Sequence, residues 1–370
     1  MIGAGPLARM THHAAIDLDV DLVVLAESSR DSAVTGGASY RLGSASCLAD
    51  IRAVAGGADV VTFGHELVPH ALLVRLEELG HCLRPASSAL HLAQDRIEAH
   101  TVLSTSGFPV PAFATVSSPR DVAAFAEARG WPVVLKRSSV GHGGRGVHVI
   151  ESASQAAALF ASSLNGDATW LVEEFIDIAA ELVVLIARTV SGRVALYPVV
   201  QMVYQDGICR YLLMPAPVAA PVADRAGRMA KSIADGIDAT GMLAVEMFLD
   251  TDGRLLVSDV ALRPHRAGYA TLEACETSQF HQHLRAVLDW PLGAPTLRAA
   301  AATVNLIGDL RDAPPSSRLL RAVGEPNVHV HLYDAASRSD GQVGHVTALA
   351  LSTTEALSMA EAVAAELVAS

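Results

Sequence analysis

The stretch PVVLKRSSVGHGGRGV, Pro132–Val147, decides the fold of this chain. Its apolar start predicts a strand that ends at Lys136, and Val147–Ile150 predicts the strand that returns after a loop. The loop itself contains Gly141, His142, Gly143, Gly144, Arg145 and Gly146. A lysine ammonium supplies a point charge, and a backbone without side chains closes over oxygen atoms, so the pattern favours a polyphosphate site. A flexible hairpin with a solvated lysine is the alternative.

The next motif, VEEFI at Val172–Ile176, favours a nucleoside site. Phe175 and Ile176 lie beside backbone groups that can hold an adenine edge, and the Glu181 carboxylate further on can accept hydrogen bonds from ribose hydroxyls. An ordinary strand that carries surface glutamates explains the same residues.

The stretch AVEMFLDTDGRLLVSDV, Ala244–Val260, predicts a hairpin that turns at Asp252-Gly253. Cross-strand pairing brings Glu246 and Asp259 toward one face. Two close carboxylates repel each other unless a cation lies between them, and hard oxygen ligands suit magnesium. Strand carboxylates that point to solvent are the alternative.

The loop LRPHRAGY, Leu262–Tyr269, follows the second carboxylate directly. Arg263 is suited to hold an oxyanion, and His265 is suited to move a proton or bind a substrate group. The alternative is a loop arginine paired with an acidic residue.

The N-terminal segment reads as a doubly wound α/β unit through about residue 95. Gly3, Gly5 and Ala8 have the spacing of a tight turn at a helix N-terminus, and the strand that should precede this turn is missing from the sequence. Buried strands are expected at Asp19–Leu25 and Asp59–Phe63, and helices at Pro69–Leu79 and Ala89–Ser104.

The remaining segments predict further strands and helices. We expect strands at Trp170–Val172, Leu182–Arg188, Val194–Val200, Val328–Tyr333 and Gly344–Leu351, and helices at Asp224–Thr240 and from Thr354 onward.

Composition limits the class of protein. The chain has 370 residues and a formal net charge of −12, which predicts two or three packed units and argues against a nucleic-acid or anionic-membrane partner. Its four cysteines lack CxxC spacing, and no apolar run reaches the roughly 18 residues of a membrane span. We therefore expect a soluble cytoplasmic protein. Only Lys136 and Lys231 are lysines.

The order of these motifs resembles the ATP-grasp superfamily, and within it the N5-carboxyaminoimidazole ribonucleotide synthetase family. The resemblance runs through GAGPLARM, AQDR, the lysine and glycine-rich loop, VEEF, VEMF, RPH and the specific run SQFHQHLRA at Ser278–Ala286. It covers nearly the whole chain.

The resemblance implies an α/β enzyme in three parts, usually a homodimer. These are a Rossmann-like domain over 1–95, an ATP-grasp domain of two antiparallel α+β subdomains over 96–295, and a small β-rich domain over 296–370. The family uses ATP and magnesium to activate bicarbonate as carboxyphosphate, and then transfers the carboxyl group to an amine.

Roles carry over by position. The resemblance assigns the phosphates to Arg96 and Lys136, their cover to Gly141–Val147, the adenine to Glu173, Glu174, Phe175 and Ile176, the ribose to Glu181, a further nucleotide contact to Tyr204, and magnesium to Glu246 and Asp259. It assigns the substrate to Glu66, Arg263, His265 and Arg338, and catalysis to Arg263 and His265.

Several positions depart from the family pattern. His100 replaces a lysine, and Ser258-Asp259 replaces Asn-Glu. Ala335 replaces the lysine, and Gly341 the arginine, that would hold the ribonucleotide phosphate, and Gln342 replaces a further lysine. We therefore predict a diverged ligase that joins bicarbonate or another carboxylate to a small-molecule amine other than the phosphoribosyl imidazole. A genuine N5-carboxyaminoimidazole ribonucleotide synthetase and a non-catalytic nucleotide-binding paralogue are the alternatives.

Overall fold

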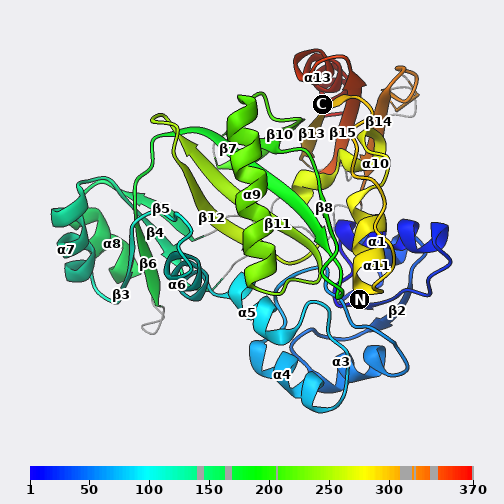
Figure 1. Ribbon diagram of the computed structural model, residues 1–370, viewed down its shortest axis with the longest axis horizontal. Helices are drawn as coiled ribbons and strands as arrows, with labels where there is room; N and C mark the ends of the chain where they lie inside the picture. The colour runs from blue at the N-terminus through cyan, green and yellow to red at the C-terminus, as the bar shows by residue number, and fades with distance from the viewer. Residues whose placement is uncertain are drawn as a thin grey trace. The chain divides into compact units, whose positions relative to one another are not determined.

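The computed structural model describes residues 1–139, 146–162, 169–205, 207–308, 319–320, 322–333 and 341–368 of a mixed α/β chain (Figure 1). Its contacts divide it into two compact units. Unit 1 comprises Met1–Leu90, Leu182–Val245 and Ala261–Ser370, and unit 2 comprises His91–Glu181 and Glu246–Val260.

The N-terminal part of unit 1 alternates helices with short parallel strands, as expected. Its elements are α1 (Pro6–Asp17), β1 (Val23–Ala26), α2 (Ser32–Thr35), β2 (Ser39–Leu42), α3 (Leu48–Ala55), α4 (His70–Glu78) and α5 (Ser87–Gln94), which continues into unit 2. Strands β1 and β2 pair in parallel. Ile2, just before the first turn, forms isolated parallel bridges with Leu25 and Phe63, and no strand precedes α1 among the described residues. Gly3 makes that turn with φ +99°, a conformation that favours glycine.

The large sheet has the order β12-β11-β7-β9-β10-β13-β15-β14, with β8 paired to β7. Its strands are β7 (Ile178–Arg188), β8 (Val194–Leu196), β9 (Val200–Gln205), β10 (Ile208–Met214), β11 (Gly241–Asp250), β12 (Leu255–Ala261), β13 (Ala300–Ile307), β14 (Val328–Leu332) and β15 (Gln342–Ala350). The accompanying helices are α9 (Ala220–Gly236), the 3-10 turn η2 (Arg266–Gly268), α10 (Thr271–Ala274), α11 (Gln279–Val287) and α13 (Thr353–Val368). Helix α13 lies against β13 and β15 (Figure 1). It contributes small buried side chains such as Ala356 and Ala360 to their shared core.

Unit 2 is built on a four-stranded antiparallel sheet of order β3-β6-β4-β5. Its elements are α6 (Arg96–Thr105), β3 (Phe113–Val116), α7 (Pro119–Arg129), β4 (Val133–Arg137), β5 (Val147–Ile150), α8 (Ala153–Ser162) and β6 (Trp170–Glu174). Leu135 and Val172 are partners in register and are fully buried in a core that includes side chains of α7 and α8. This core fixes β4 and β6, the two strands that carry the predicted site residues Lys136 and Glu173.

The predicted hairpin at Asp252-Gly253 is present as β11 and β12, and Gly253 has φ +82°.

Three predictions of helices and strands need correction. The single helix Ala89–Ser104 is two helices, because Asp95 caps α6 with its own side chain. The strand Val194–Val200 is interrupted between β8 and β9, where Pro198 has no N–H to donate. The strand Asp59–Phe63 is reduced to bridges at Val61 and Phe63.

Within the described ranges, no helix combines the length and the apolar character that crossing a bilayer requires.

Candidate nucleotide and metal site

The N-terminus of α6 is tied to the end of β4 by a cluster of hydrogen bonds in unit 2. Asp95 accepts hydrogen bonds from the backbone N–H groups of Ile97 (2.9 Å) and Glu98 (3.1 Å) and from Ser138 Oγ (2.7 Å). The Arg96 backbone N–H donates to the Ser138 carbonyl at 2.9 Å. This cluster fixes Arg96 beside β4, the strand that carries Lys136.

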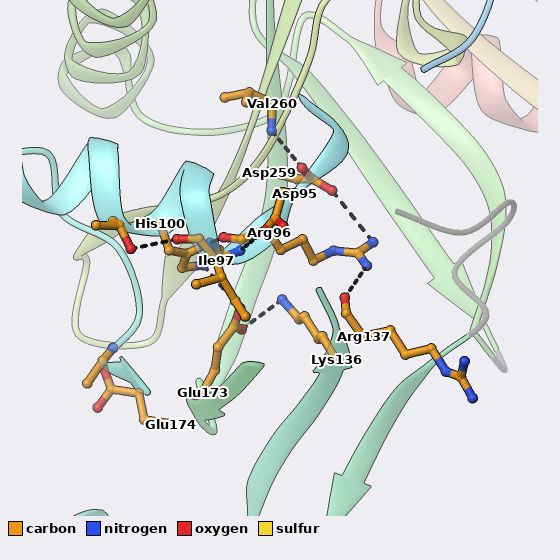
Figure 2. Close-up of polar contacts among 12 residues, drawn as sticks. Asp95, Arg96, Ile97, His100, Lys136, Arg137, Glu173, Glu174, Asp259 and Val260 are labelled. Carbon is orange, nitrogen blue, oxygen red and sulfur yellow. Dashed lines mark hydrogen bonds and ion pairs between the residues drawn. The ribbon is translucent and has the colours of Figure 1, made fainter. Parts of the chain in front are cut away.

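The Arg96 guanidinium extends between two oxygen atoms of unit 2. It donates to the Arg137 carbonyl at 3.1 Å and lies 3.9 Å from Asp259 Oδ2 (Figure 2). The second distance is near the limit of an ion pair, so most of the arginine's capacity to bind a planar anion is unused by Asp259.

Lys136 belongs to a buried chain of three titratable groups. Its Nζ lies 2.7 Å from Glu173 Oε2, and His100 Nε2 lies 3.0 Å from Glu173 Oε1 (Figure 2). The side chains of His100 and Glu173 are each only 2% exposed. Burial by itself raises the pKa of Glu173, but Lys136 and His100 outweigh it and leave that pKa below its usual value. Glu173 is therefore a carboxylate.

In unit 2, burial and the Glu246 carboxylate disfavour the charged forms of Asp259 and Glu181. Burial raises the pKa of Asp259 to about 6, with Arg96 opposing and Glu246 adding to the rise. Burial and Glu246 together raise the pKa of Glu181 to about 7. The Asp259 side chain is 32% exposed, so solvent still reaches it.

The carboxylates of Glu246 and Asp259 suit a magnesium ion that is also bound by phosphates better than a metal ion held by protein ligands alone. Among the described residues, no group of three or more His, Cys, Asp or Glu side chains is arranged to hold a metal ion. Magnesium is usually held by one or two carboxylates together with substrate phosphates. A bound cation would favour the charged form of Asp259 against the burial and the Glu246 charge that raise its pKa. Glu246 and Asp259 therefore fit the predicted ion.

The VEEF segment is divided between buried and exposed side chains. Glu173 contacts Lys136 and His100, and Glu174 accepts a hydrogen bond from the Ala112 N–H at 2.9 Å. Phe175 is exposed and Ile176 is buried. The two glutamate side chains thus have partners in unit 2, and an adenine contact here would depend on backbone groups and on the apolar side chains.

The predicted substrate residues lie in unit 1. Arg263 Nε donates to Glu66 Oε2 at 2.7 Å, which joins two residues that are 197 positions apart. His265 is buried, and its Nδ1 accepts a hydrogen bond from the Ala267 N–H at 3.3 Å. Gln279 holds the His265 backbone at both its N–H (2.9 Å) and its carbonyl (2.6 Å). Arg263 and His265 are thus each held in place by hydrogen bonds within unit 1.

The other predicted residues are distributed as follows. Tyr204 lies on β9 in unit 1 and is 39% exposed. Gly146 has φ +93° and its carbonyl accepts a hydrogen bond from the Arg137 N–H. Gly141, His142, Gly143, Gly144, Arg145 and Arg338 lie outside the described residues.

Sequence reasoning missed two contacts of this site. It treated Glu173 as part of an adenine segment rather than as the partner of Lys136, and it did not single out Asp95 as a helix cap. The Asp95 signal was available, since aspartate before a helical run is a frequent N-cap. The Glu173 contact joins residues 37 positions apart and has no local signal.

Three family models match the chain. Residues 1–94 match the ribonucleotide synthetase preATP-grasp domain, residues 101–280 the ATP-grasp domain, and residues 301–359 the phosphoribosylaminoimidazole carboxylase C-terminal domain. ATP-grasp enzymes use ATP with magnesium, which agrees with the two predicted cofactors.

Named relatives and solved structures match along nearly the whole of this chain. The N5-carboxyaminoimidazole ribonucleotide synthase of Mycobacterium tuberculosis (strain H37Rv) is 39% identical over 368 residues, which cover 98% of this chain and 85% of the relative. The N5-carboxyaminoimidazole ribonucleotide synthetase structure from Thermus thermophilus has a TM-score of 0.88 at 32% identity, covering 100% of this chain and 99% of the other.

A third match is the N5-carboxyaminoimidazole synthase of Aspergillus clavatus, solved in complex with ADP and 5-aminoimidazole ribonucleotide. It has a TM-score of 0.88 at 27% identity and covers 99% of this chain and 98% of the other. The likeness to all three extends over both compact units. This chain belongs to the N5-carboxyaminoimidazole ribonucleotide synthase family of ATP-grasp ligases.

Proposed function

We propose that the protein carboxylates the amine of 5-aminoimidazole ribonucleotide, using ATP, magnesium and bicarbonate. The observation that supports this best is 39% identity to a named synthase over 98% of the chain. A solved relative of the same fold binds ADP and that ribonucleotide. The proposal therefore prefers the purine-pathway activity over the different amine that the sequence departures favoured.

The chemistry has two steps. A bicarbonate oxygen attacks the γ-phosphorus of ATP, ADP leaves, and carboxyphosphate forms. The amine then attacks the carboxyl carbon of carboxyphosphate, inorganic phosphate leaves, and the amine loses a proton. In both steps the enzyme has to neutralise oxygen atoms that carry or develop negative charge.

The residues of unit 2 are assigned to the nucleotide. Lys136 and Arg96 neutralise phosphate oxygens, and Glu246 and Asp259 hold magnesium, which when bound offsets the charge of the transferred phosphoryl group. Glu181 accepts a hydrogen bond from ribose. In unit 1, Arg263 is assigned to the carboxyl oxyanion and is oriented by Glu66, while His265 is assigned to the acceptor amine.

One observation favours a second candidate, an acceptor without a 5′-phosphate. Gln342 stands where the family pattern has a lysine, and its side chain is buried and donates to Asn305 Oδ1 at 2.7 Å. A side chain turned inward in this way does not supply a phosphate contact. The acceptor would then be a smaller or less charged amine.

The test is an assay of the purified full chain with ATP, magnesium and bicarbonate. The proposal predicts ADP release that depends on both bicarbonate and 5-aminoimidazole ribonucleotide, with the carbamate product trapped from ¹³C-bicarbonate. Equal stimulation by the corresponding riboside without phosphate would favour the second candidate. Binding of ATP with no turnover on any amine of a panel would contradict both.

A further inference from the structure

His100 lies at the end of the buried chain Lys136–Glu173–His100. Its ring is 2% exposed and is surrounded by three elements of unit 2. From β6, Glu173 faces Nε2 at 3.0 Å, and from β3 the uncharged ring of Phe113 packs edge-on at 5.2 Å. From β4, Lys136 reaches the same carboxylate on its other oxygen at 2.7 Å.

The two ring nitrogens of His100 both face acceptors. Nδ1 lies 2.9 Å from the Arg96 carbonyl oxygen, which can only accept a hydrogen bond, so Nδ1 carries a proton. Nε2 faces the Glu173 carboxylate, which is likewise an acceptor. Among the described residues, Nε2 and Glu173 Oε1 have no hydrogen-bond partner besides each other. Only the doubly protonated imidazolium satisfies both contacts.

Other charges near His100 lie on its own helix. The Arg96 side chain is directed to Asp259 and to the Arg137 carbonyl, and Asp95 caps the helix through backbone N–H groups. Glu98 is exposed. Glu173 is therefore the carboxylate that directly faces the ring, and Lys136 is the cation that shares it.

The net charge of Lys136, Glu173 and His100 together depends on the protonation of His100. With the imidazolium, two cations face one carboxylate and a net charge of +1 remains for a polyphosphate. With neutral imidazole, Glu173 cancels Lys136 and the net charge is zero. A lysine ammonium has three N–H groups, and Lys136 uses one of them for Glu173. The remaining donors attract phosphate best when the imidazolium neutralises Glu173.

We propose that His100 is a positioning residue whose protonated ring neutralises Glu173 and frees Lys136 for the nucleotide, so that ATP binds more weakly when the ring is neutral. This inference rests on the proposed nucleotide role of Lys136. It adds a pH-dependent element to that site, whose charge would be permanent if a lysine stood at position 100.

The test compares the ATP dissociation constant of three full-length proteins between about pH 6 and pH 9. These are the wild type, His100→Lys, which keeps the charge at every pH, and His100→Gln, which never carries it. The titration of ATP itself is common to all three and cancels when ratios are taken. We expect the wild type to match His100→Lys at the acid end and to approach His100→Gln at the alkaline end, a change of about tenfold.

Three further measurements keep the outcomes separate. His81→Lys adds the same charge in unit 1 and is expected to leave the pH profile of ATP binding unchanged. Thermal unfolding shows whether each variant is folded. Nitrogen-15 spectra of the histidine rings, assigned by comparison with His100→Gln, are expected to show both His100 nitrogens protonated at acid pH.

A constant ratio between wild type and His100→Lys over the whole pH range overturns the inference and leaves the proposed function intact. A wild type that fails to bind ATP at every pH contradicts the proposed function. In that case the nitrogen-15 spectra still show whether the His100 ring is doubly protonated beside Glu173. A singly protonated ring at acid pH overturns the inference about His100 as well.

Discussion

Asp259 carries a negative charge in surroundings that disfavour it. Its pKa is raised to about 6, chiefly by burial and with Glu246 contributing, while the Arg96 guanidinium at 3.9 Å compensates only in part. A charge kept at such a position costs stability and is typical of a residue retained for binding. A substitution that removes the Asp259 charge should therefore raise the stability of the ligand-free protein and weaken magnesium binding.

We predict that Asp259→Asn stabilises the ligand-free protein by about 1 kcal/mol at neutral pH, after allowance for the partial exposure of the side chain. The same variant should lose most of the additional stability that magnesium and ATP together confer on the wild type. Urea unfolding with and without ligands measures both effects. Asp252→Asn, in the exposed turn of the same hairpin, is the control and should change neither. Full magnesium-dependent stabilisation of Asp259→Asn would remove this residue from the metal site.

Lys136 is one of two lysines in the chain, so a matched control is available. Lys136→Met should weaken ATP binding by about ten- to a hundredfold, because one charge-assisted contact to phosphate is lost. It should also destabilise the protein, because buried Glu173 keeps only His100 as a partner. Lys231→Met removes an exposed pair with Asp235 and should do neither. Calorimetric titration with ATP distinguishes the two, and equal affinities would exclude Lys136 from the nucleotide site.

At this scale the sequence predicted residue types better than contacts. Lys136, Glu246 and Asp259 could be singled out because a strand-end lysine before glycines, and two carboxylates across a hairpin, are local patterns. The pairing of Lys136 with Glu173 depends on the register of β4 against β6, which places Lys136 opposite Leu171 and Val134 opposite Glu173. Register is set by packing of both faces, and no short window of sequence contains it.

At the scale of elements, Asp95 joins a helix to a strand. It caps α6 and also accepts a hydrogen bond from Ser138, two residues beyond Lys136. Asp95→Ala should lower the free energy of unfolding by about 1–2 kcal/mol, the usual cost of a lost cap. It should also weaken ATP binding, because Arg96 and Lys136 lose their fixed separation.

The control for this prediction is a cap of another helix in the same unit. Ser118 caps α7 in a capping box with Asp121. Ser118→Ala should lower stability by a similar amount and leave ATP affinity unchanged. Stability comes from urea unfolding and affinity from equilibrium titration. If both variants weaken ATP binding equally, a general loss of stability in unit 2 explains the effect. Asp95 then has no specific role in positioning Arg96 and Lys136.

The elements themselves were predictable where periodicity and turn residues agree. The β11–β12 hairpin and the antiparallel pair β14–β15 were placed within a few residues. The alternation of strands and helices predicted the α/β class of the N-terminal part only, and the class of the whole chain came from the family resemblance. The prediction joined α5 and α6 into one helix because apolar spacing continues through Asp95. Asp95 is a frequent type of N-cap residue and could have marked the break, but the apolar spacing was given more weight.

At the scale of the whole molecule, His283 connects three distant stretches of unit 1. Its Nδ1 accepts a hydrogen bond from the Met242 N–H at 3.1 Å, so Nε2 carries the proton and donates to Thr62 Oγ1 at 2.8 Å. Thr62 and His283 are 221 positions apart. This contact joins the N-terminal part of unit 1 to α11 and β11. No sequence pattern near Thr62 or His283 predicts it.

This network should make folding stability depend on pH. Burial is the main cause that lowers the pKa of His283 to about 3 from 6.5. Between these values the unfolded chain binds a proton on this residue that the folded protein does not. Stability is therefore lost as pH falls through this window, by at most about 1.4 kcal/mol per pH unit from this one group.

His283→Gln keeps one acceptor and one donor but does not titrate. We expect it to be less stable than the wild type at pH 7.5, because the ring leaves a cavity beside Gly241, and to lose less stability on acidification. The difference in unfolding free energy between the two proteins should thus shrink from about pH 6.5 downward. His281→Gln, at a partly exposed position of the same helix, is the control for substitution of a histidine in α11. If the wild type and His283→Gln lose stability in parallel as pH falls, then His283 is not the group whose protonation opposes folding.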